Sequence, residues 1–207
     1  MCGIIGVKSI SISRDNFEND ILMSLKHRGP DYRSFEQIND FFIGHARLSI
    51  IDLSTAGNQP MKSVDGNLIL TFNGEIYNYL EIRNELKKRG HSFNSNSDTE
   101  VILNAYIEYG IDCFGLFEGM FAISIYNISN NKLILVRDSV GIKPLYYFLD
   151  EHLIAYSSEV RSFKKILKNL DFNDDWKVYL LLFGYIPSPF TTYKNVFSVP
   201  PGSFVEI

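Results

Sequence analysis

A cysteine directly follows the initiator methionine in the opening stretch MCGIIGVKSI. Most cysteines act as small buried hydrophobes, which could stand anywhere in a core. Removal of Met1 would instead leave Cys2 with a free α-amino group beside its own thiol. A thiol with a pKa of about 8.5 exchanges a proton easily with an amine of about 7.7–8.0, so such a cysteine could act as a nucleophile without a distant base. The position alone does not decide between this role and a packing role.

A second candidate for chemistry is the tripeptide Asn73-Gly74-Glu75, which follows the apolar run LILTF. An amide side chain beside a glycine N–H can direct two hydrogen-bond donors at one point, as an oxyanion hole requires. An Asn-Gly pair is also an ordinary turn. The tripeptide alone leaves both interpretations open.

Two charged residues stand at the ends of predicted elements. Arg47 follows an apolar stretch, and its planar guanidinium suits bidentate capture of a carboxylate, although an isolated arginine is also a common surface ion-pair partner. Asp98 falls just inside a predicted helix start, where the helix dipole favours an acid in any case. Neither residue is informative alone.

The remaining residues of chemical interest indicate no cofactor. The four histidines, His27, His45, His91 and His152, show no metal-ligand spacing and are interpreted as structural. Neither GxxxxGK[ST] nor GxGxxG occurs, so no nucleotide or metal site is expected in this chain. Cys113 is interpreted as a core residue, because two cysteines are too few for a disulfide framework.

Composition limits the class of protein. The 207 residues are 45% hydrophobic, enough for one sizeable core. A net charge of −4 gives no electrostatic reason to expect nucleic acid or an anionic membrane as a partner. No apolar run approaches the roughly 20 residues of a membrane span, and the start of the chain has no signal-peptide layout. The expectation is a soluble cytoplasmic protein.

Strands and helices that would position these residues come in runs rather than in strict alternation. Helices are expected after Asn78, with a capping box at Asn78 and Glu81, and after Ser97, with a box at Ser97 and Glu100. Closely spaced strands must pair antiparallel, which favours an α+β layered domain. The expected strands cover 3–10, 41–50, 68–72, 120–127, 132–138, 144–149 and 153–158, and two further helices cover 157–167 and 174–184.

The end of the chain changes character after Gly184. Proline and small residues dominate YIPSPFTTYKNVFSVPPG, and SFVEI then begins like a strand at the last residues. We therefore expect the compact part to span about residues 2–186. Residues 187–207 are interpreted as a segment leading toward a further part of a longer chain.

Taken together, these motifs resemble one family. The stretches are MCGIIGV, HRGPD, GHARLSIIDLS, NQPM, FNGEIYNY, SDTEVIL, FEGMFAISIY, RDSVGIKPLYY and SSEVRSF, in this order. They resemble the glutaminase domain of the glutamine-hydrolysing asparagine synthetases, within the class II glutamine amidotransferases. The resemblance implies an N-terminal nucleophile hydrolase fold over 2–207: a four-layer αββα sandwich of two antiparallel sheets between helical layers. It also implies that 187–207 precedes an ATP-binding synthetase domain.

The resemblance assigns roles to the candidate residues. Cys2 is expected to be the nucleophile, with its own α-amino group as base, and Asn73 and Gly74 to form the oxyanion hole. Arg47 would hold the α-carboxylate of glutamine, and Asp98, with Glu75 nearby, the α-ammonium. ATP and Mg²⁺ would be needed only in the absent synthetase domain, the expected partner of this one.

Some alternatives stay open. The same glutaminase could serve another amidation acceptor, in sugar, cell-surface polysaccharide or antibiotic pathways, or the domain could be an idle binding or assembly module. An idle copy would be expected to lose Cys2, Asn73 or Asp98, and all three are present. The sequence does not decide whether the domain forms a homodimer. It departs from the usual family pattern at Tyr32-Arg33 and at Ser139.

Overall fold

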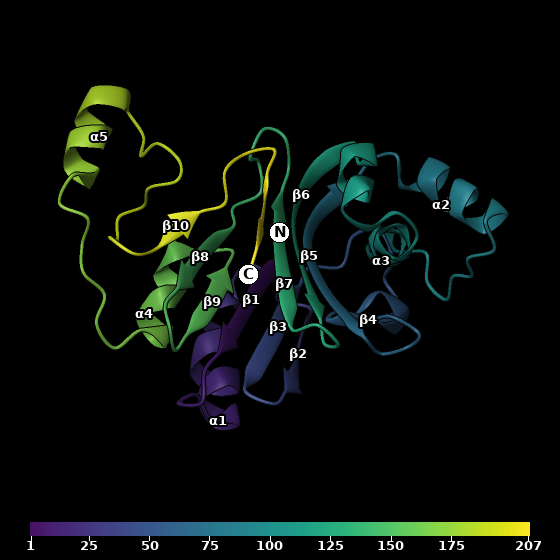
Figure 1. The fold of residues 1–207 in the computed structure, drawn as a ribbon, viewed down its shortest axis with the longest axis horizontal. Helices are drawn as coiled ribbons and strands as arrows, with labels where there is room; N and C mark the ends of the chain where they lie inside the picture. The colour runs from purple at the N-terminus through teal and green to yellow at the C-terminus, as the bar shows by residue number, and fades with distance from the viewer.

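The computed structural model describes residues 1–207, and its eleven strands form two antiparallel sheets that face each other (Figure 1). The strands are β1 (Gly3–Lys8), β2 (Tyr32–Ile38), β3 (Phe41–Arg47), β4 (Met61–Lys62), β5 (Leu68–Ile76), β6 (Gly119–Asn127), β7 (Lys132–Arg137), β8 (Tyr146–Leu149), β9 (Ile154–Ser157), β10 (Phe197–Ser198) and β11 (Phe204–Glu206). One sheet has the order β10-β8-β9-β1-β3-β2, and the other β11-β7-β6-β5-β4.

Helices cover the two outer faces of this pair of sheets (Figure 1). The helical segments of the chain are α1 (Arg14–Asn16), η1 (Phe17–Ile21), η2 (Leu22–Leu25), η3 (Thr55–Gly57), α2 (Tyr79–Lys88), α3 (Asp98–Tyr109), η4 (Gly110–Leu116), η5 (Val160–Ser162), α4 (Phe163–Ile166) and α5 (Trp176–Phe183). None of them is both long and apolar enough to span a membrane. The order of layers confirms the predicted αββα sandwich.

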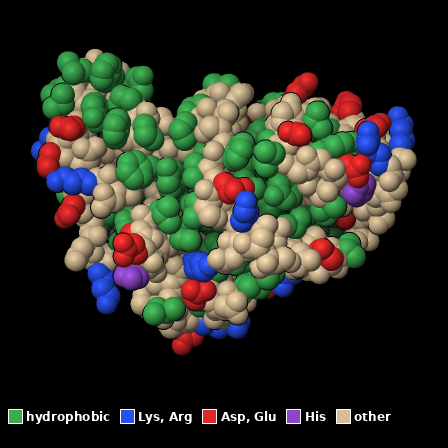
Figure 2. All heavy atoms as spheres, viewed as in Figure 1, with side chains coloured by type: hydrophobic (Ala, Val, Ile, Leu, Met, Phe, Trp, Pro, Cys, Tyr) green, Lys and Arg blue, Asp and Glu red, His purple; other side chains and the backbone are tan.

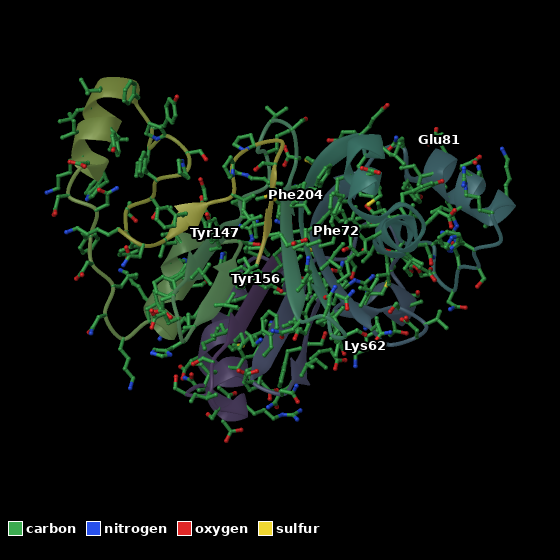
Figure 3. All side chains as sticks on the ribbon, in the orientation of Figure 1. Lys62, Phe72, Glu81, Tyr147, Tyr156 and Phe204 are labelled. Carbon is green, nitrogen blue, oxygen red and sulfur yellow. The ribbon has the colours of Figure 1, made fainter.

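Side-chain alternation along the strands divides the core into three clusters. On β1, Ile5 and Val7 pack against η1, η2 and α4, whereas Ile4 packs between the sheets. On β5, Leu70 packs under α2 and α3, and Ile69 packs between the sheets. Figure 3 labels Phe72 on β5, which packs on the helix side with Leu70, and Tyr156 on β9, which packs between the sheets with Ile69. Alternate residues on strands of both sheets therefore fill the space between the sheets.

The two long helices confirm the predicted ones, but neither begins with the expected capping box. At the start of α3 only the Ser97 half forms, because the Glu100 carboxylate accepts from the N–H groups of Asn94 and Ser95 instead of that of Ser97. Ser97 Oγ accepts a hydrogen bond from the N–H of Thr99 at 3.0 Å and caps α3. The capping box at Asn78 is wrong, because this side chain binds the loop after η4 instead. Its Nδ2 donates to the carbonyl of Leu116 at 2.9 Å, and its Oδ1 accepts from the N–H of Glu118 at 3.1 Å.

Three other segments differ from expectation. The helix expected over 157–167 shrinks to η5 and α4, because Ser157 and Ser158 still continue the pairing with β1. Strand β2 and the helical segment from α1 to η2 had no sequence signal of their own. The helical segment supplies buried side chains to the outer face of β1.

The segment after residue 186 is packed onto the sheets, contrary to the expected limit of the compact part. Strand β10 pairs with β8, β11 pairs with β7, and Tyr193, Val196 and Val199 are buried. It is α5 that stands out from the body instead, with Leu181 87% and Leu182 70% exposed. Figure 2 shows the apolar side chains gathered over this helix at the upper left.

Candidate active site

All six predicted site residues line one pocket at an end of the space between the sheets. Cys2 precedes β1, Arg47 ends β3, and Asn73, Gly74 and Glu75 lie near the end of β5; the sixth residue is Asp98, the first residue of α3. Segments far apart in the sequence thus meet at a single point. The structure supplies the proximity that none of the motifs could establish singly.

Strand register explains why the side chains point into the same space. Gly3 pairs with Ala46, which places Cys2 beside the end of β3 that carries Arg47. Alternation directs Cys2 to the same side of β1 as Ile4, which packs between the sheets. On β5, the same rule puts Asn73 on the side of Ile69, which faces the first sheet.

The Cys2 thiol is half-buried and held at short range by one neighbouring residue. Its Sγ accepts a hydrogen bond from the N–H of Leu48 at 3.3 Å and lies 3.5 Å from the carbonyl oxygen of the same residue. Burial raises the pKa of the Cys2 thiol, while the Leu48 hydrogen bond and the charges of the terminal amine and Arg47 oppose the rise. Met1 precedes Cys2 here and also lines the pocket.

Asn73 brings an unused hydrogen-bond donor to the pocket. Its Nδ2 is buried and has no partner, although nearly all buried polar atoms in proteins have one. Gly74 next to it is required by close packing: a Cβ there would clash with the backbone of Met120 and lie 2.7 Å from Phe121 Cα. An amide N–H₂ free to donate is what a developing oxyanion would use.

The Arg47 guanidinium is buried and wrapped by the loop that follows β3. Its Nη1 donates to the carbonyl of Ser54 at 2.8 Å and to Asn58 Oδ1 at 2.5 Å, and its Nη2 donates to the carbonyl of Asp52. Gly57 gives the loop room, because a Cβ there would lie 2.6 Å from Nη2. Arg47 therefore fixes the loop while bringing a positive charge to the pocket.

Asp98 brings a buried carboxyl group to the pocket from the start of α3. It is 5% exposed, and burial raises its pKa to about 6, with a further rise from the charge of Glu75. Hydrogen bonds from the backbone N–H groups of Ile76 and Thr99 oppose that rise. The pocket thus holds a cation and an anion, together with a thiol and a free amide donor, a set that could bind and attack a zwitterionic amino acid.

Several residues of the site were not singled out from the sequence. Gln59 is the clearest, since its Oε1 accepts from the N–H of Phe72 at 2.6 Å and its Nε2 donates to Thr99 Oγ1 at 3.0 Å. It therefore ties β5 to the start of α3. Lys143 also lines the pocket, and burial lowers the pKa of its ammonium group. Both lie in quoted motifs, NQPM and GIKPLYY, whose presence was the available signal.

Two of the residues interpreted as structural, His45 and Cys113, are buried. His45 is fully buried with its pKa lowered to about 3 by burial, so it is neutral, and its Nε2 lies 3.2 Å from the carbonyl oxygen of Phe72. Cys113 packs in the core beneath α3, where burial raises its pKa to about 12. Tyr32, one of the departures from the family pattern, pairs with Arg47 across β2 and β3.

Comparison with known proteins gives this geometry a family. A family model described as a glutamine amidotransferase domain matches residues 1–207. The chain belongs to this family. Among the relatives of this amidotransferase domain, asparagine synthetase [glutamine-hydrolyzing] 1 of Bacillus subtilis (strain 168) is 35% identical over 208 residues, covering 98% of the chain and 33% of that protein. Asparagine synthetase [glutamine-hydrolyzing] 2 of Oryza sativa subsp. japonica is 37% identical over 167 residues, covering 78% and 28%.

The amidotransferase domain therefore spans about a third of the length of these relatives. Its fold is shared with a solved structure of glutamine phosphoribosylpyrophosphate amidotransferase from B. subtilis, complexed with ADP and GMP. The two chains superpose with a TM-score of 0.74 at 20% identity, over 100% of this chain and 47% of the other. At that identity the likeness supports the fold alone.

Proposed function

We propose that this domain hydrolyses the side-chain amide of glutamine to glutamate and ammonia through a thioester on Cys2. The observation that carries the proposal is the pocket itself. Its lining includes the Cys2 thiol, just before β1, the unpartnered Asn73 Nδ2 on β5, and the charged groups of Arg47 and Asp98. Family membership supports the same reaction.

In the first half-reaction, Cys2 Sγ attacks the amide carbon of glutamine, and the thiol proton passes to the α-amino group that Met1 removal exposes. Asn73 Nδ2 and the Gly74 N–H donate to the oxyanion. The C–N bond then breaks, the nitrogen takes the proton from the α-amino group, and ammonia leaves. Water attacks the remaining γ-glutamyl thioester, releasing glutamate and restoring the thiol.

Arg47 and Asp98 account for the choice of glutamine over a simple amide. Arg47 holds the α-carboxylate, and Asp98, with Glu75, holds the α-ammonium. Each contact is made only with a free amino acid, so both convert binding energy into correct placement of the amide over Sγ.

The ammonia supplies an ATP-dependent asparagine synthetase part that lies outside this chain. The names of the relatives support that acceptor, and their greater length supports the existence of a second part. Nucleotide and Mg²⁺ belong to that part and not to this domain. Another amidation acceptor is an alternative that the same pocket would serve equally.

The direct test incubates the chain with glutamine, aspartate and Mg-ATP, and measures glutamate, ammonia, AMP and asparagine separately. We expect glutamate and ammonia in equal amounts, with neither AMP nor asparagine. Cys2→Ala should abolish turnover, whereas Cys113→Ala, which alters the other cysteine, should keep it. Diazo-oxo-norleucine should label Cys2 alone. Turnover by Cys2→Ala would overturn the thioester mechanism. Asparagine formation would overturn the proposal that asparagine is made by a part outside this chain.

A further inference from the structure

Glu159 lies just beyond β9 and holds three cationic or polar side chains at once. Its Oε1 accepts a hydrogen bond from Arg28 Nη1 at 3.1 Å and lies 2.6 Å from His27 Nε2, and its carboxylate also pairs with Arg161. The Glu159 side chain is only 17% exposed and that of Arg28 only 9%. Burial alone would raise the pKa of Glu159, but the hydrogen bonds from His27 and Arg28 hold it below its ordinary value.

Arg28 connects this carboxylate to the nucleophile. Its Nε donates to the carbonyl oxygen of Cys2 at 2.8 Å, so one guanidinium joins Glu159 to the backbone that carries the thiol. Gly3 leaves space for this contact, since a Cβ there would lie 3.3 Å from Arg28 Cδ and 3.1 Å from Leu25 Cδ1. The close approach of Arg28 to the chain start is thus built into the packing.

The residue before Glu159 fixes the chain on the other side of Gly3. The N–H of Ser158 donates to the carbonyl of Ile4 at 2.9 Å, and the N–H of Ile4 donates to Ser158 Oγ at 3.0 Å. The SSEVRSF motif therefore holds β1 directly at Ile4 and, through Arg28, at Cys2. Arg28, Ser158 and Glu159 themselves do not line the pocket.

We propose that Glu159 is a positioning residue that, through Arg28, fixes the Cys2 carbonyl and so aims Sγ at the bound amide. The inference rests on the proposed glutaminase function. Once Met1 is removed, Cys2 has no chain on its amino side, and free chain ends are poorly ordered unless contacts hold them. After Met1 is removed, Cys2 takes part in only one peptide group, the one it forms with Gly3. The Glu159–Arg28 pair supplies such a contact at the carbonyl oxygen of that group.

A second carboxylate offers a matched control. Glu108 on α3 holds an arginine and a histidine in the same way: its Oε1 accepts from Arg89 Nη1 at 3.2 Å, and its Oε2 lies 2.8 Å from His91 Nε2. It lines no part of the pocket. If kcat falls when Glu159 is removed but not when Glu108 is removed, the fall is due to the connection to Cys2. It is then not a general effect of losing a carboxylate that binds an arginine and a histidine.

The experiment compares Glu159→Ala, Glu159→Gln and Glu108→Ala with the parent chain. Because small displacements of a reacting atom cost up to about a hundredfold in rate, we expect Glu159→Ala to lower kcat by about tenfold or more. Its KM for glutamine should stay within about twofold, since Arg47 and Asp98 are untouched. Glu159→Gln, which can still accept from Arg28, should lose less. Glu108→Ala should change neither constant.

Alkylation by iodoacetamide gives an independent readout that does not need turnover. Loosening the chain start should expose the half-buried thiol, so Cys2 of Glu159→Ala should react about threefold faster or more, while turnover falls. Buried Cys113 reports the fold and should stay unreactive in every variant. Unchanged kcat and unchanged Cys2 alkylation in both Glu159 variants would overturn the proposal. Absence of glutaminase activity in the parent chain would overturn the proposed function. The comparison of Cys2 alkylation rates between the parent chain and Glu159→Ala would then test by itself whether Glu159 positions Cys2.

Discussion

Asp98 Oδ2 accepts a hydrogen bond of 3.2 Å from the backbone N–H of Ile76, the last residue of β5. This bond joins the start of α3 to the strand that carries Asn73 and Gly74. The proposed ammonium anchor and the proposed oxyanion donors are therefore held at a fixed separation. The bond also lowers the pKa of Asp98, although burial outweighs it and leaves the value at about 6.

The raised pKa predicts that glutamine binding weakens in mild acid. Above pH 6 Asp98 is ionised and can pair with the α-ammonium of glutamine, whereas below pH 6 it is increasingly protonated and the pair is lost. We expect KM to rise as pH falls from 7 to 5, by at most about tenfold per pH unit. Steady-state kinetics across this range measure it. Asp98→Asn should have a high KM that no longer depends on pH.

A surface carboxylate provides the control for that measurement. Glu81 lies exposed on α2 (Figure 3), and Glu81→Gln should keep the pH dependence of the parent chain. A parent KM that stays constant between pH 5 and 7 would contradict the assignment of Asp98 as the ammonium anchor.

The same shift has a consequence for stability. The pKa of Asp98 is higher in the folded chain than its ordinary value of 3.8, so between about pH 4 and pH 6 the folded state binds more protons than the unfolded state. The free energy of unfolding contributed by Asp98 therefore decreases as pH rises through this window. Asp98→Asn should raise the thermal midpoint by several degrees more at pH 7 than at pH 4.5. Equal effects at both values would show that Asp98 ionises normally.

Gly74→Ala should damage both the fold and the site. The added Cβ would meet the backbone of Met120 and Phe121 on β6, and backbone cannot move aside as a flexible side chain can. Overpacking of this kind costs about 1–3 kcal/mol, and it would also displace the adjacent Asn73. Urea unfolding and glutamine turnover measure the two effects. Gly115→Ala, where a Cβ has no neighbour within 4 Å, should leave both unchanged.

Arg47→Ala should lower kcat/KM for glutamine by roughly tenfold to several hundredfold, because one charge-assisted contact is worth a few kcal/mol. The informative quantity is selectivity: the variant should no longer prefer glutamine over glutamine α-amide, which lacks the carboxylate. Asn58→Ala removes one bond between Arg47 and its loop but keeps the charge, so it should keep the preference. Undiminished selectivity in Arg47→Ala would make Arg47 a purely structural residue.

Strong local patterns made most strands and the two long helices predictable. The start of β1 and the cap of α3 at Ser97 were visible as short motifs. The Asn-Gly step was a turn signal in the sequence, but the structure continues β5 through it to Ile76. The capping box at Asn78 failed because Leu116 and Glu118, distant in sequence, offer that side chain better partners. The spacing of residues at a helix start gives no information about partners that are distant in the sequence.

The pocket was predictable only in part for the same reason. Residue types indicated the thiol, the amide and the two charges, since each has its own chemistry. The supports of these groups were missed because they are side chains whose partners are backbone atoms far along the chain. Gln59 reaches the N–H of Phe72, and Arg28 reaches the carbonyl of Cys2. Only the folded chain brings these pairs together.

The mature domain should begin at Cys2. Met1 is 56% exposed and belongs to none of the three core clusters, so its removal should leave the fold intact. The free α-amine of Cys2, with an ordinary pKa of about 7.7–8.0, would then accept the thiol proton near neutral pH. Intact-mass measurement of active protein should show the methionine absent.

A chain extended before Met1 by an uncleaved tag tests the role of the free amine. It should bind glutamine and still be alkylated at Cys2, yet turn over at least about a hundredfold more slowly, because it lacks the base. Full turnover by that extended chain would mean that another group accepts the proton.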